Sequence, residues 1–228
     1  MNKEVVVITG GTKGLGRALA EQCVAKGCRV IICAREKDEV EAVAREIGTT
    51  PFVADVTKEA DVKALADFAV ATFGQIDIWI NNAGVWIPHA PVEQLDIERV
   101  RHMFEVNVFG VMSGSHYALL QMRKQEKGII ININSISGLV GHATSSGYAA
   151  SKWAARGFSE SLRAECKGSA ISVINVYPNY MKTDLFNEKK PEDLESYMPP
   201  ESVAQKIIEN LEQENPQEEL IIRQLQSK

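Results

Sequence analysis

Short apolar runs alternate with longer amphipathic stretches along the whole chain. Continuous apolar runs of this length are typical of strands that are buried on both faces of a sheet. The pattern predicts seven strands, at residues 5–8, 29–33, 51–54, 76–80, 128–134, 171–177 and 220–222.

The stretches between these runs place apolar residues three or four positions apart, which predicts helices. The predicted helices occupy residues 15–25, 36–47, 57–73, 97–124, 145–167 and 201–214. We expect Thr57 to be the N-cap of the third helix and Gly74 to stop it. The helical pattern of residues 97–124 breaks near Asn107 and Gly110, so we expect two pieces there.

Regular alternation of strand and helix predicts the fold class. It indicates a single-domain, Rossmann-like α/β fold: a doubly wound parallel sheet of about seven strands, with helices on both faces and right-handed crossovers. No repeat or linker interrupts residues 1–228. The polar segment 180–198 follows the sixth strand and is expected over the carboxyl edge of the sheet, where ligands bind. We interpret it as a substrate lid, with an inert surface loop as the alternative.

Composition narrows the class of protein. The chain is 45% hydrophobic and 24% charged with a net charge of −5, which does not favour nucleic acid or an acidic membrane as a partner. No apolar run is long enough for a membrane span or signal peptide, so a cytoplasmic protein is expected. Four cysteines occur without a C-x-x-C pair or a histidine cluster, which predicts buried reduced thiols and no metal site. They are Cys23, Cys28, Cys33 and Cys166.

A glycine-rich turn follows the first predicted strand and opens the first helix, over residues 9–16. Gly10 permits a tight turn, while Gly14 and Gly16 let the backbone approach a pyrophosphate and let the helix pack on the strand. The N–H groups at the helix N-terminus attract an anion. Glycines serve turns generally, but the position between strand and helix favours a dinucleotide site.

The end of the second strand distinguishes the two nicotinamide cofactors. Enzymes that use NAD usually place Asp or Glu there, whereas this chain has Cys33, Ala34 and Arg35. Arg35 can pair with a 2′-phosphate, and Lys13 can reach the same group. These features favour NADP(H), although the neighbouring Glu36 argues the other way and both cations have an alternative as solvated surface charges.

Tyr148 and Lys152 lie four residues apart in a predicted helix and share one face. Ser135 closes the fifth strand, and the following loop can bring it beside Tyr148. A phenol has a reference pKa near 10, which a nearby ammonium group lowers. Tyr148 can then give a proton to a carbonyl oxygen as hydride arrives, while Ser135 holds that oxygen. Taken alone, the pair is more consistent with two residues on an ordinary surface helix.

The motifs together resemble those of the short-chain dehydrogenase/reductase family, over nearly the whole chain from Val5 to about Ile222. The matching positions, in order, are Thr9, Gly10, Gly14, Gly16, Asp55, Asn81–Gly84, Asn107, Ser135, Tyr148 and Lys152.

The resemblance implies roles for individual residues. Lys152 would bind the nicotinamide ribose and tune Tyr148, and Asn107 would hold a water that links Lys152 to solvent. Asp55 and Val56 would contact the adenine. The catalytic residues implied are Asn107, Ser135, Tyr148 and Lys152. The cofactor-binding residues implied are Gly10, Thr12, Lys13, Gly14, Leu15, Gly16, Arg35, Asp55, Val56, Asn81, Ala83, Gly84, Tyr148, Lys152, Pro178 and Thr183.

Residues 81–84 and the turn after the sixth strand have more specific expectations. Asn81, Ala83 and Gly84 would line the adenine ribose, while Asn82 would tie the central strands together. The family usually has Pro-Gly after the sixth strand, where this chain has Pro178 and Asn179. Asn tolerates unusual backbone angles better than most residues, so the turn can survive.

The expected function is that of an NADP(H)-dependent oxidoreductase acting on a small-molecule carbonyl or alcohol, mainly as a ketone or aldehyde reductase. The family resemblance also implies a homodimer or homotetramer. The alternatives are a catalytically silent NADP(H)-binding sensor or scaffold, which would typically lack the Tyr or Lys, and a dehydratase or epimerase, which would typically be longer. The expected substrate wall comprises Trp86, His89, Ser137, His142, Tyr180 and Leu185.

Overall fold

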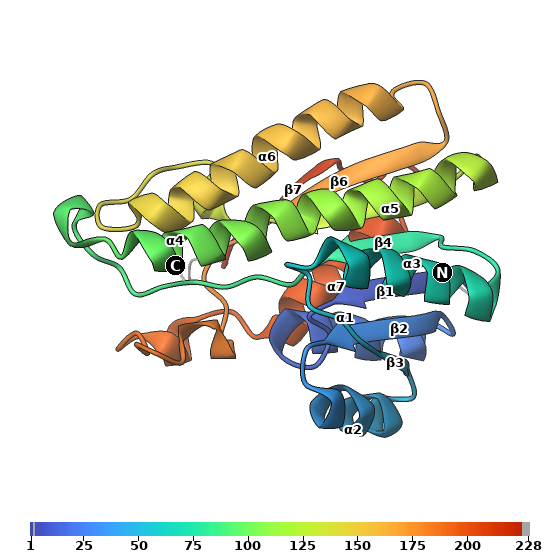
Figure 1. Ribbon diagram of the computed structural model, residues 1–228, viewed down its shortest axis with the longest axis horizontal. Coiled ribbons are helices and arrows are strands. Elements are labelled where there is room, and N and C mark those ends of the chain that lie inside the picture. Colours follow the sequence, from blue (N-terminus) through green and yellow to red (C-terminus); the bar gives the residue numbers. More distant parts are fainter. Residues whose placement is uncertain (2, 225–228) are drawn as a thin grey trace.

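Seven strands pair in parallel in one sheet of order β3-β2-β1-β4-β5-β6-β7 (Figure 1). The computed structural model describes Met1 and residues 3–224, so Asn2 and the last four residues of the expected domain lie outside the described residues. The strands are β1 Val5–Thr9, β2 Arg29–Ala34, β3 Thr50–Val53, β4 Ile78–Asn81, β5 Gly128–Ile133, β6 Ile171–Pro178 and β7 Glu219–Ile222. The predicted fold class is confirmed.

Helices cover both faces of the sheet (Figure 1). They are α1 Gly14–Ala25, α2 Lys37–Ile47, α3 Glu59–Phe73, α4 Ile97–Phe104, α5 Gly110–Gln125, α6 Ser146–Cys166 and α7 Pro200–Leu211. Short 3₁₀ turns are η1 Val92–Gln94, η3 Ile136–Gly138, η4 Asp184–Phe186 and η5 Leu194–Ser196. The turn η2 Glu105–Phe109 is π-helical. None of the helices in the described part of the chain is long and apolar enough to cross a membrane.

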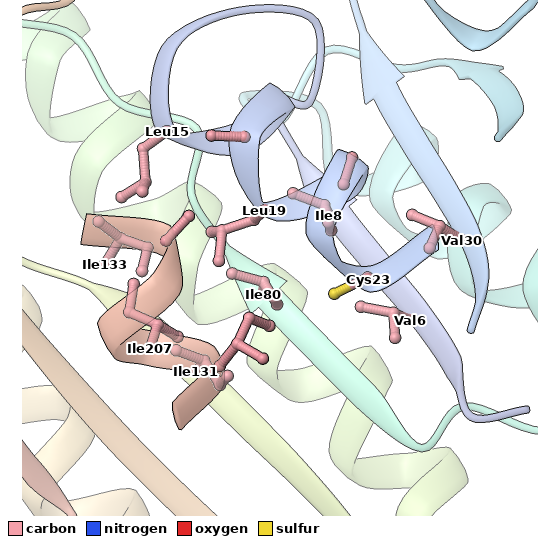
Figure 2. Packing of buried hydrophobic residues seen from close by; sticks show 14 of the residues in the cluster. Val6, Ile8, Leu15, Leu19, Cys23, Val30, Ile80, Ile131, Ile133 and Ile207 are labelled. Carbon is pink, nitrogen blue, oxygen red and sulfur yellow. The ribbon is translucent and has the colours of Figure 1, made fainter. Parts of the chain in front are cut away.

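The core has two layers because successive strand residues point to opposite faces. Ile8 and Ile80 face α1 and α7, where they pack with Leu19 and Ile207 (Figure 2). Val7 and its neighbours on the other face pack against α3, α5 and α6. Each fully buried aliphatic side chain contributes about 1.5–3 kcal/mol relative to exposure to water. The sheet is therefore a rigid platform whose carboxyl edge carries the loops described below.

One local prediction needs correction. Thr57 is not the N-cap of α3, since its N–H and hydroxyl both donate to Asp55 Oδ1 and the helix begins at Glu59 after Lys58. The stop at Gly74, with φ of +82°, is confirmed. The expected division of residues 97–124 into two pieces is confirmed, because the π-helical turn η2 around Asn107 separates α4 from α5, which begins at Gly110. All four cysteines are free and buried, as predicted.

The segment 180–198 is tied together at its two ends. Met181 forms a parallel bridge with Met198, Lys182 N–H donates to Met198 O at 2.9 Å, and Met198 N–H donates to Tyr180 O at 3.1 Å. Inside this closed loop lie η4 and η5. The segment thus has more local structure than its polar sequence indicates.

Buried amides tie β4 to its neighbours. Asn81 Nδ2 donates to Asn132 Oδ1 of β5 at 2.8 Å and to Ser115 Oγ of α5 at 3.0 Å, while its Oδ1 accepts from Trp79 Nε1 at 2.8 Å. Asn132 Nδ2 continues the chain of hydrogen bonds to Ser159 Oγ of α6. Because Asn81 is still within β4, two residues after Trp79, it points to the same face as Trp79, toward α5.

This network generates a prediction about Gly114. A Cβ atom at Gly114 would lie 2.1 Å from Asn81 Oδ1 and 2.7 Å from Trp79 Nε1. We expect Gly114→Ala to lower the free energy of unfolding by about 2 kcal/mol, because overpacking exceeds the gain of about 1 kcal/mol in helix propensity. Urea denaturation measures this change. The control is Gly157→Ala in α6, where a Cβ meets nothing within 4 Å; equal stability of the two variants would contradict the packing argument.

Candidate functional site

Two adjoining cavities open at the carboxyl edge of the sheet. The first, of about 840 Å³, runs from the glycine-rich turn to Tyr148, and the second, of about 460 Å³, runs from Tyr148 beneath the segment 180–198. Both are lined by Trp86, Asn134, Tyr148, Met181, Thr183 and Leu185. They therefore form one continuous crevice with Tyr148 at the junction.

The glycine-rich turn has the close backbone contacts that the sequence predicts. Gly10 has φ of +63°, and a Cβ there would lie 3.0 Å from Ala83 Cα. A Cβ at Gly16 would lie 2.2 Å from Gly10 O, so only glycine lets α1 approach the turn this closely. Gly14 lies beneath Thr183, whose Cγ2 would be 3.2 Å from a Cβ at that position. Thr183 thus joins the turn to the opposite side of the crevice.

The N-terminus of α1 opens on the first cavity without a cap. Its N-cap residue Lys13 makes no side-chain capping bond, and its first turn contains no acidic residue. In α4, by contrast, Asp96 accepts a hydrogen bond from Arg99 N. The uncapped N–H groups and the helix dipole fit an anionic group such as a diphosphate. Thr12 and Leu15 also line this cavity.

The cavity ends beside the tip of β2, where Arg35 and Lys13 line it together with Glu36 and Glu39. Lys13 Nζ lies 3.8 Å from Glu39 Oε1, in an exposed pair of the kind that contributes little free energy. Arg35 forms no ion pair with any carboxylate among the described residues. Its guanidinium group therefore stays available to an anion.

Asp55 and Val56 line the same cavity. Burial acts to raise the pKa of the Asp55 carboxyl, but the two hydrogen bonds from Thr57 and the charges of Arg35 and Lys58 outweigh it and lower that pKa. Asp55 therefore both forms a local turn with Thr57 and lines the cavity.

Of the four residues after Ile80, three line the cavity and Asn81 does not. Asn82, Ala83 and Gly84 face it, and Asn82 Nδ2 donates to Thr9 O and Gly10 O at 2.9 Å. The expectation that Asn82 ties the central strands is confirmed. The expectation that Asn81 lines the adenine ribose needs correction, because its side chain is 2% exposed and is used by the network on the opposite side of β4.

Lys152 is the most buried charged side chain of the site, at 6% exposure. Its Nζ donates to Ile133 O at the end of β5, at 3.2 Å, and lies 5.8 Å from the centroid of the Tyr148 ring. Burial lowers the pKa of the Lys152 amine to about 8. A neutral amine and an ammonium group are thus both accessible close to neutral pH.

The pKa of Tyr148 differs from the sequence-based expectation. Burial raises it to about 12, and a hydrogen bond with Ser135 only partly opposes this effect. Lys152 does not lower it here, because the amine faces the ring and donates to the Ile133 carbonyl. Ser135 lies beside Tyr148 as predicted, and its Oγ also accepts from Ser137 N at 3.1 Å.

Asn107 occupies the π-helical turn η2 and is fully buried. Its Oδ1 accepts from Val85 N at 2.9 Å, and its Nδ2 donates to Val85 O at 2.9 Å and to Ser151 Oγ at 3.2 Å. A Cβ at Gly84 would lie 3.4 Å from Asn107 Oδ1 and 3.9 Å from Lys152 Nζ. Asn107 therefore lies next to Lys152, behind the wall of the crevice.

Two features escaped the sequence analysis. Asn134 lines both cavities, donates from Nδ2 to Lys152 O at 3.2 Å and accepts at Oδ1 from Ser135 N at 2.9 Å. Its place next to Ser135 at the strand end was the available signal. Arg99 of α4 donates to both carboxylate oxygens of Glu188 at 2.7 Å, which ties the segment 180–198 across the crevice. No local pattern indicates a pairing over that separation.

The second cavity has aromatic walls. All six residues expected in the substrate wall line it, and so does Pro178. Trp86 contacts Phe186 edge-on with ring centroids 5.1 Å apart, and Tyr180 stacks on Tyr197 at 4.9 Å. The arrangement can hold an apolar body next to the hydroxyl groups of Ser135 and Tyr148, which can exchange a proton with a bound oxygen atom.

Comparison with known proteins places the chain among oxidoreductases. A family model described as short chain dehydrogenase matches residues 4–194. The chain is 36% identical to cis-4-hydroxycyclohexanecarboxylate dehydrogenase of Sinomonas cyclohexanicum over 187 residues, covering 80% of this chain and 75% of that protein. It is 35% identical to NADP-dependent (R)-specific alcohol dehydrogenase of Lentilactobacillus kefiri over 192 residues, covering 81% and 76%.

The fold recurs in a solved structure of an alcohol dehydrogenase from the archaeon Thermococcus sibiricus, complexed with 5-hydroxy-NADP. The TM-score is 0.91 at 24% identity, with 100% of this chain and 99% of the other covered. This likeness confirms the architecture.

The buried amine generates a prediction about stability. The pKa of Lys152 is about 8 in the folded protein against an ordinary value of 10.5, so folding disfavours the charged form. The resulting loss of folding stability is complete below about pH 8, where Lys152 is charged in both the folded and the unfolded protein. It disappears as the pH rises toward 10.5, where the unfolded protein also loses the proton. We expect Lys152→Met to be more stable than the wild type by about 2 kcal/mol near pH 7, and this advantage to shrink between pH 8 and 10.5.

Thermal unfolding across this pH range measures the effect, with Lys206→Met on the exposed side of α7 as the control. A Lys152→Met variant that is destabilised equally at every pH would show that the charged Lys152 side chain does not lower the stability of the folded protein.

Proposed function

The chain belongs to the short-chain dehydrogenase family, and we propose that it is an NADP(H)-dependent reductase of ketones or aldehydes, able also to oxidise the corresponding alcohols. The observation that carries this proposal is the position of Tyr148, at the junction of two cavities and above the buried Lys152. One cavity has an uncapped helix N-terminus that suits a dinucleotide, and the other has aromatic walls that suit a small organic molecule.

The protonation state of Tyr148 suits reduction. Because its pKa is raised to about 12, the phenol keeps its proton throughout the neutral range. A carbonyl oxygen that gains negative charge needs a proton donor, and Tyr148 supplies that proton while Ser135 donates a hydrogen bond to the same oxygen. Reduced nicotinamide supplies the hydride when it is bound. In the alcohol direction Tyr148 must first lose its proton, which requires a nearby positive charge or a higher pH.

Lys152 and Asn107 have supporting roles in the proposal. Lys152 holds the ribose next to the nicotinamide and returns a proton to Tyr148, which its lowered pKa permits near neutrality. Asn107 lies beside it and belongs to the path by which that proton is exchanged with solvent. Its hydrogen bonds to Val85 and Ser151 hold its amide in place next to Gly84 and Lys152.

Preference for NADP(H) over NAD(H) is supported by the charges at the tip of β2. Arg35 and Lys13 line the crevice where the adenosine ribose would bind, and the strand ends without a carboxylate at residues 33–35. The remaining cofactor contacts are proposed for Gly10, Thr12, Gly14, Leu15, Asp55, Val56, Ala83, Gly84, Pro178 and Thr183. The relative from Lentilactobacillus kefiri is NADP-dependent, which agrees with this assignment.

The segment 180–198 is proposed as the lid over the substrate. Its tied ends, its contribution to both cavities and the ion pair between Arg99 and Glu188 support this role. The expected homodimer or homotetramer stays a prediction.

The first test of this function is Tyr148→Phe. Removing the hydroxyl removes the proton donor, so we expect turnover of activated ketones with NADPH to fall by about 100-fold or more, with little change in NADPH binding. The matched control is Tyr117→Phe, whose hydroxyl bonds to Glu59 and lines neither cavity. Tight NADPH binding without turnover of any ketone by the wild type would instead identify a silent sensor.

The second test concerns the 2′-phosphate. We expect Arg35→Ala to raise the Kd of NADPH about 10-fold or more and to leave that of NADH nearly unchanged, because only NADPH carries the charge that Arg35 pairs with. Calorimetric titration with both cofactors measures this, and Arg45→Ala on the exposed side of α2 is the control. An equal loss for both cofactors would rule out the 2′-phosphate contact.

A further inference from the structure

Cationic and imidazole side chains gather in the lining of the second cavity. Lys189 and Lys190 line it with His89 and His142, and Glu192 is the one acidic residue of its described lining. The two lysines enter from the segment 180–198, and the histidines come from the loops that follow β4 and β5. Three separate segments thus bring nitrogen groups to the lining of one cavity of about 460 Å³.

The two lysines lack the partners that neighbouring cations have. Arg99 pairs with Glu188, and Lys182 pairs with Glu195 of the same segment. Neither Lys189 nor Lys190 lies within ion-pair distance of a carboxylate among the residues that the structure describes. Their charges are therefore not neutralised by an ion pair within the described residues, whereas Lys182, Glu188 and Glu195 of the same segment are all paired.

These groups also influence one another electrostatically. Burial lowers the pKa of His89, and the charges of His142 and Lys189 lower it further. A cavity with partly apolar walls focuses such a field and attracts anions. Glu192 opposes the field but leaves an excess of positive charge.

The rest of the cavity has different chemistry. Trp86, Phe186 and Tyr197 form a connected aromatic cluster, with centroid distances of 5.1 Å and 5.9 Å along it. Ser135 and Tyr148 lie at the inner end, next to the cofactor cavity. An elongated ligand would therefore meet hydroxyl groups at its inner end, aromatic rings along its body and cations at its outer end.

We propose that the carbonyl substrate carries an anionic group such as a carboxylate, which Lys189 and Lys190 bind while the apolar body lies against Trp86 and Phe186. This inference rests on the proposed reductase function and names the substrate class of the same site. In the reaction the carbonyl carbon gains a hydride and its oxygen gains the Tyr148 proton, so the anionic group is unchanged. It serves for positioning and selection, and His89 and His142 donate further hydrogen bonds to it.

The test compares two ketones of nearly equal size and shape, the anionic 4-acetylbenzoate and the neutral 4-acetylbenzamide. With the full-length wild type and NADPH we expect kcat/KM to be about tenfold higher for the carboxylate, and this preference to weaken as salt is added. The double variant K189A/K190A should lose the preference through a higher KM for the carboxylate and keep its rate on the amide. Lys206→Ala, which removes an exposed charge from α7, should leave the carboxylate-to-amide preference unchanged. Glu192→Gln, which removes the opposing negative charge, should raise that preference.

A binding measurement separates this inference from the reductase function. Quenching of tryptophan fluorescence by 4-isopropylbenzoate and 4-isopropylbenzamide needs no turnover. A carboxylate preference that K189A/K190A abolishes would support the anion site, even if no ketone were reduced and the reductase function failed. Equal affinities for the two compounds in the wild type, or equal losses of both in the double variant, would overturn the anion site even if ketones were reduced.

Discussion

The site depends on one buried amine and the carbonyl that holds it. Lys152 Nζ donates to Ile133 O at the last residue of β5, which places the amine beneath the Tyr148 ring. Burying a charged group is unfavourable, as the lowered pKa of this lysine indicates. The buried amine lines the first cavity next to Tyr148, where the proposed mechanism needs it to contact both a cofactor ribose and the phenol.

The sheet fixes the partners of this amine with few degrees of freedom. The ends of β1, β4 and β5 are joined by side-chain amides: Asn82 bonds to the turn after β1, and the buried Asn81 bonds to Asn132 of β5. Asn134 then links Ser135 to the backbone of α6 at Lys152. Preorganisation of this kind is what proton transfer at a bound carbonyl requires. The loops after β4, β5 and β6, by contrast, supply most of the lining of the second cavity.

Much of this arrangement could be predicted from the sequence because it depends on local pattern. Apolar runs defined the strands, helical spacing put Tyr148 and Lys152 on one face, and the position of Gly10 after a strand indicated the close turn. The side of the sheet that Asn81 faces could also have been found, since it follows Trp79 by two positions within one strand. The predicted strand ended at residue 80, which made Asn81 a loop residue and led to the wrong expectation that it lines the cofactor cavity.

Other features depend on tertiary structure and have no local signal. The raised pKa of Tyr148 results from burial, which motif spacing does not report. The ion pair between Arg99 and Glu188 joins residues far apart in sequence, and the electrostatic effect of Lys189 on His89 requires the segment 180–198 to lie near the loop after β4.

Transfer of an isotopic label tests the central claim most directly. The wild-type enzyme should be incubated with an activated aryl ketone and NADPH that carries deuterium at the transferable C4 position, and the alcohol product should be analysed by mass spectrometry. The account predicts that the deuterium appears on the carbinol carbon and that Tyr148→Phe nearly abolishes its transfer. An alcohol without deuterium, or unreduced ketone beside tightly bound NADPH, would contradict the account.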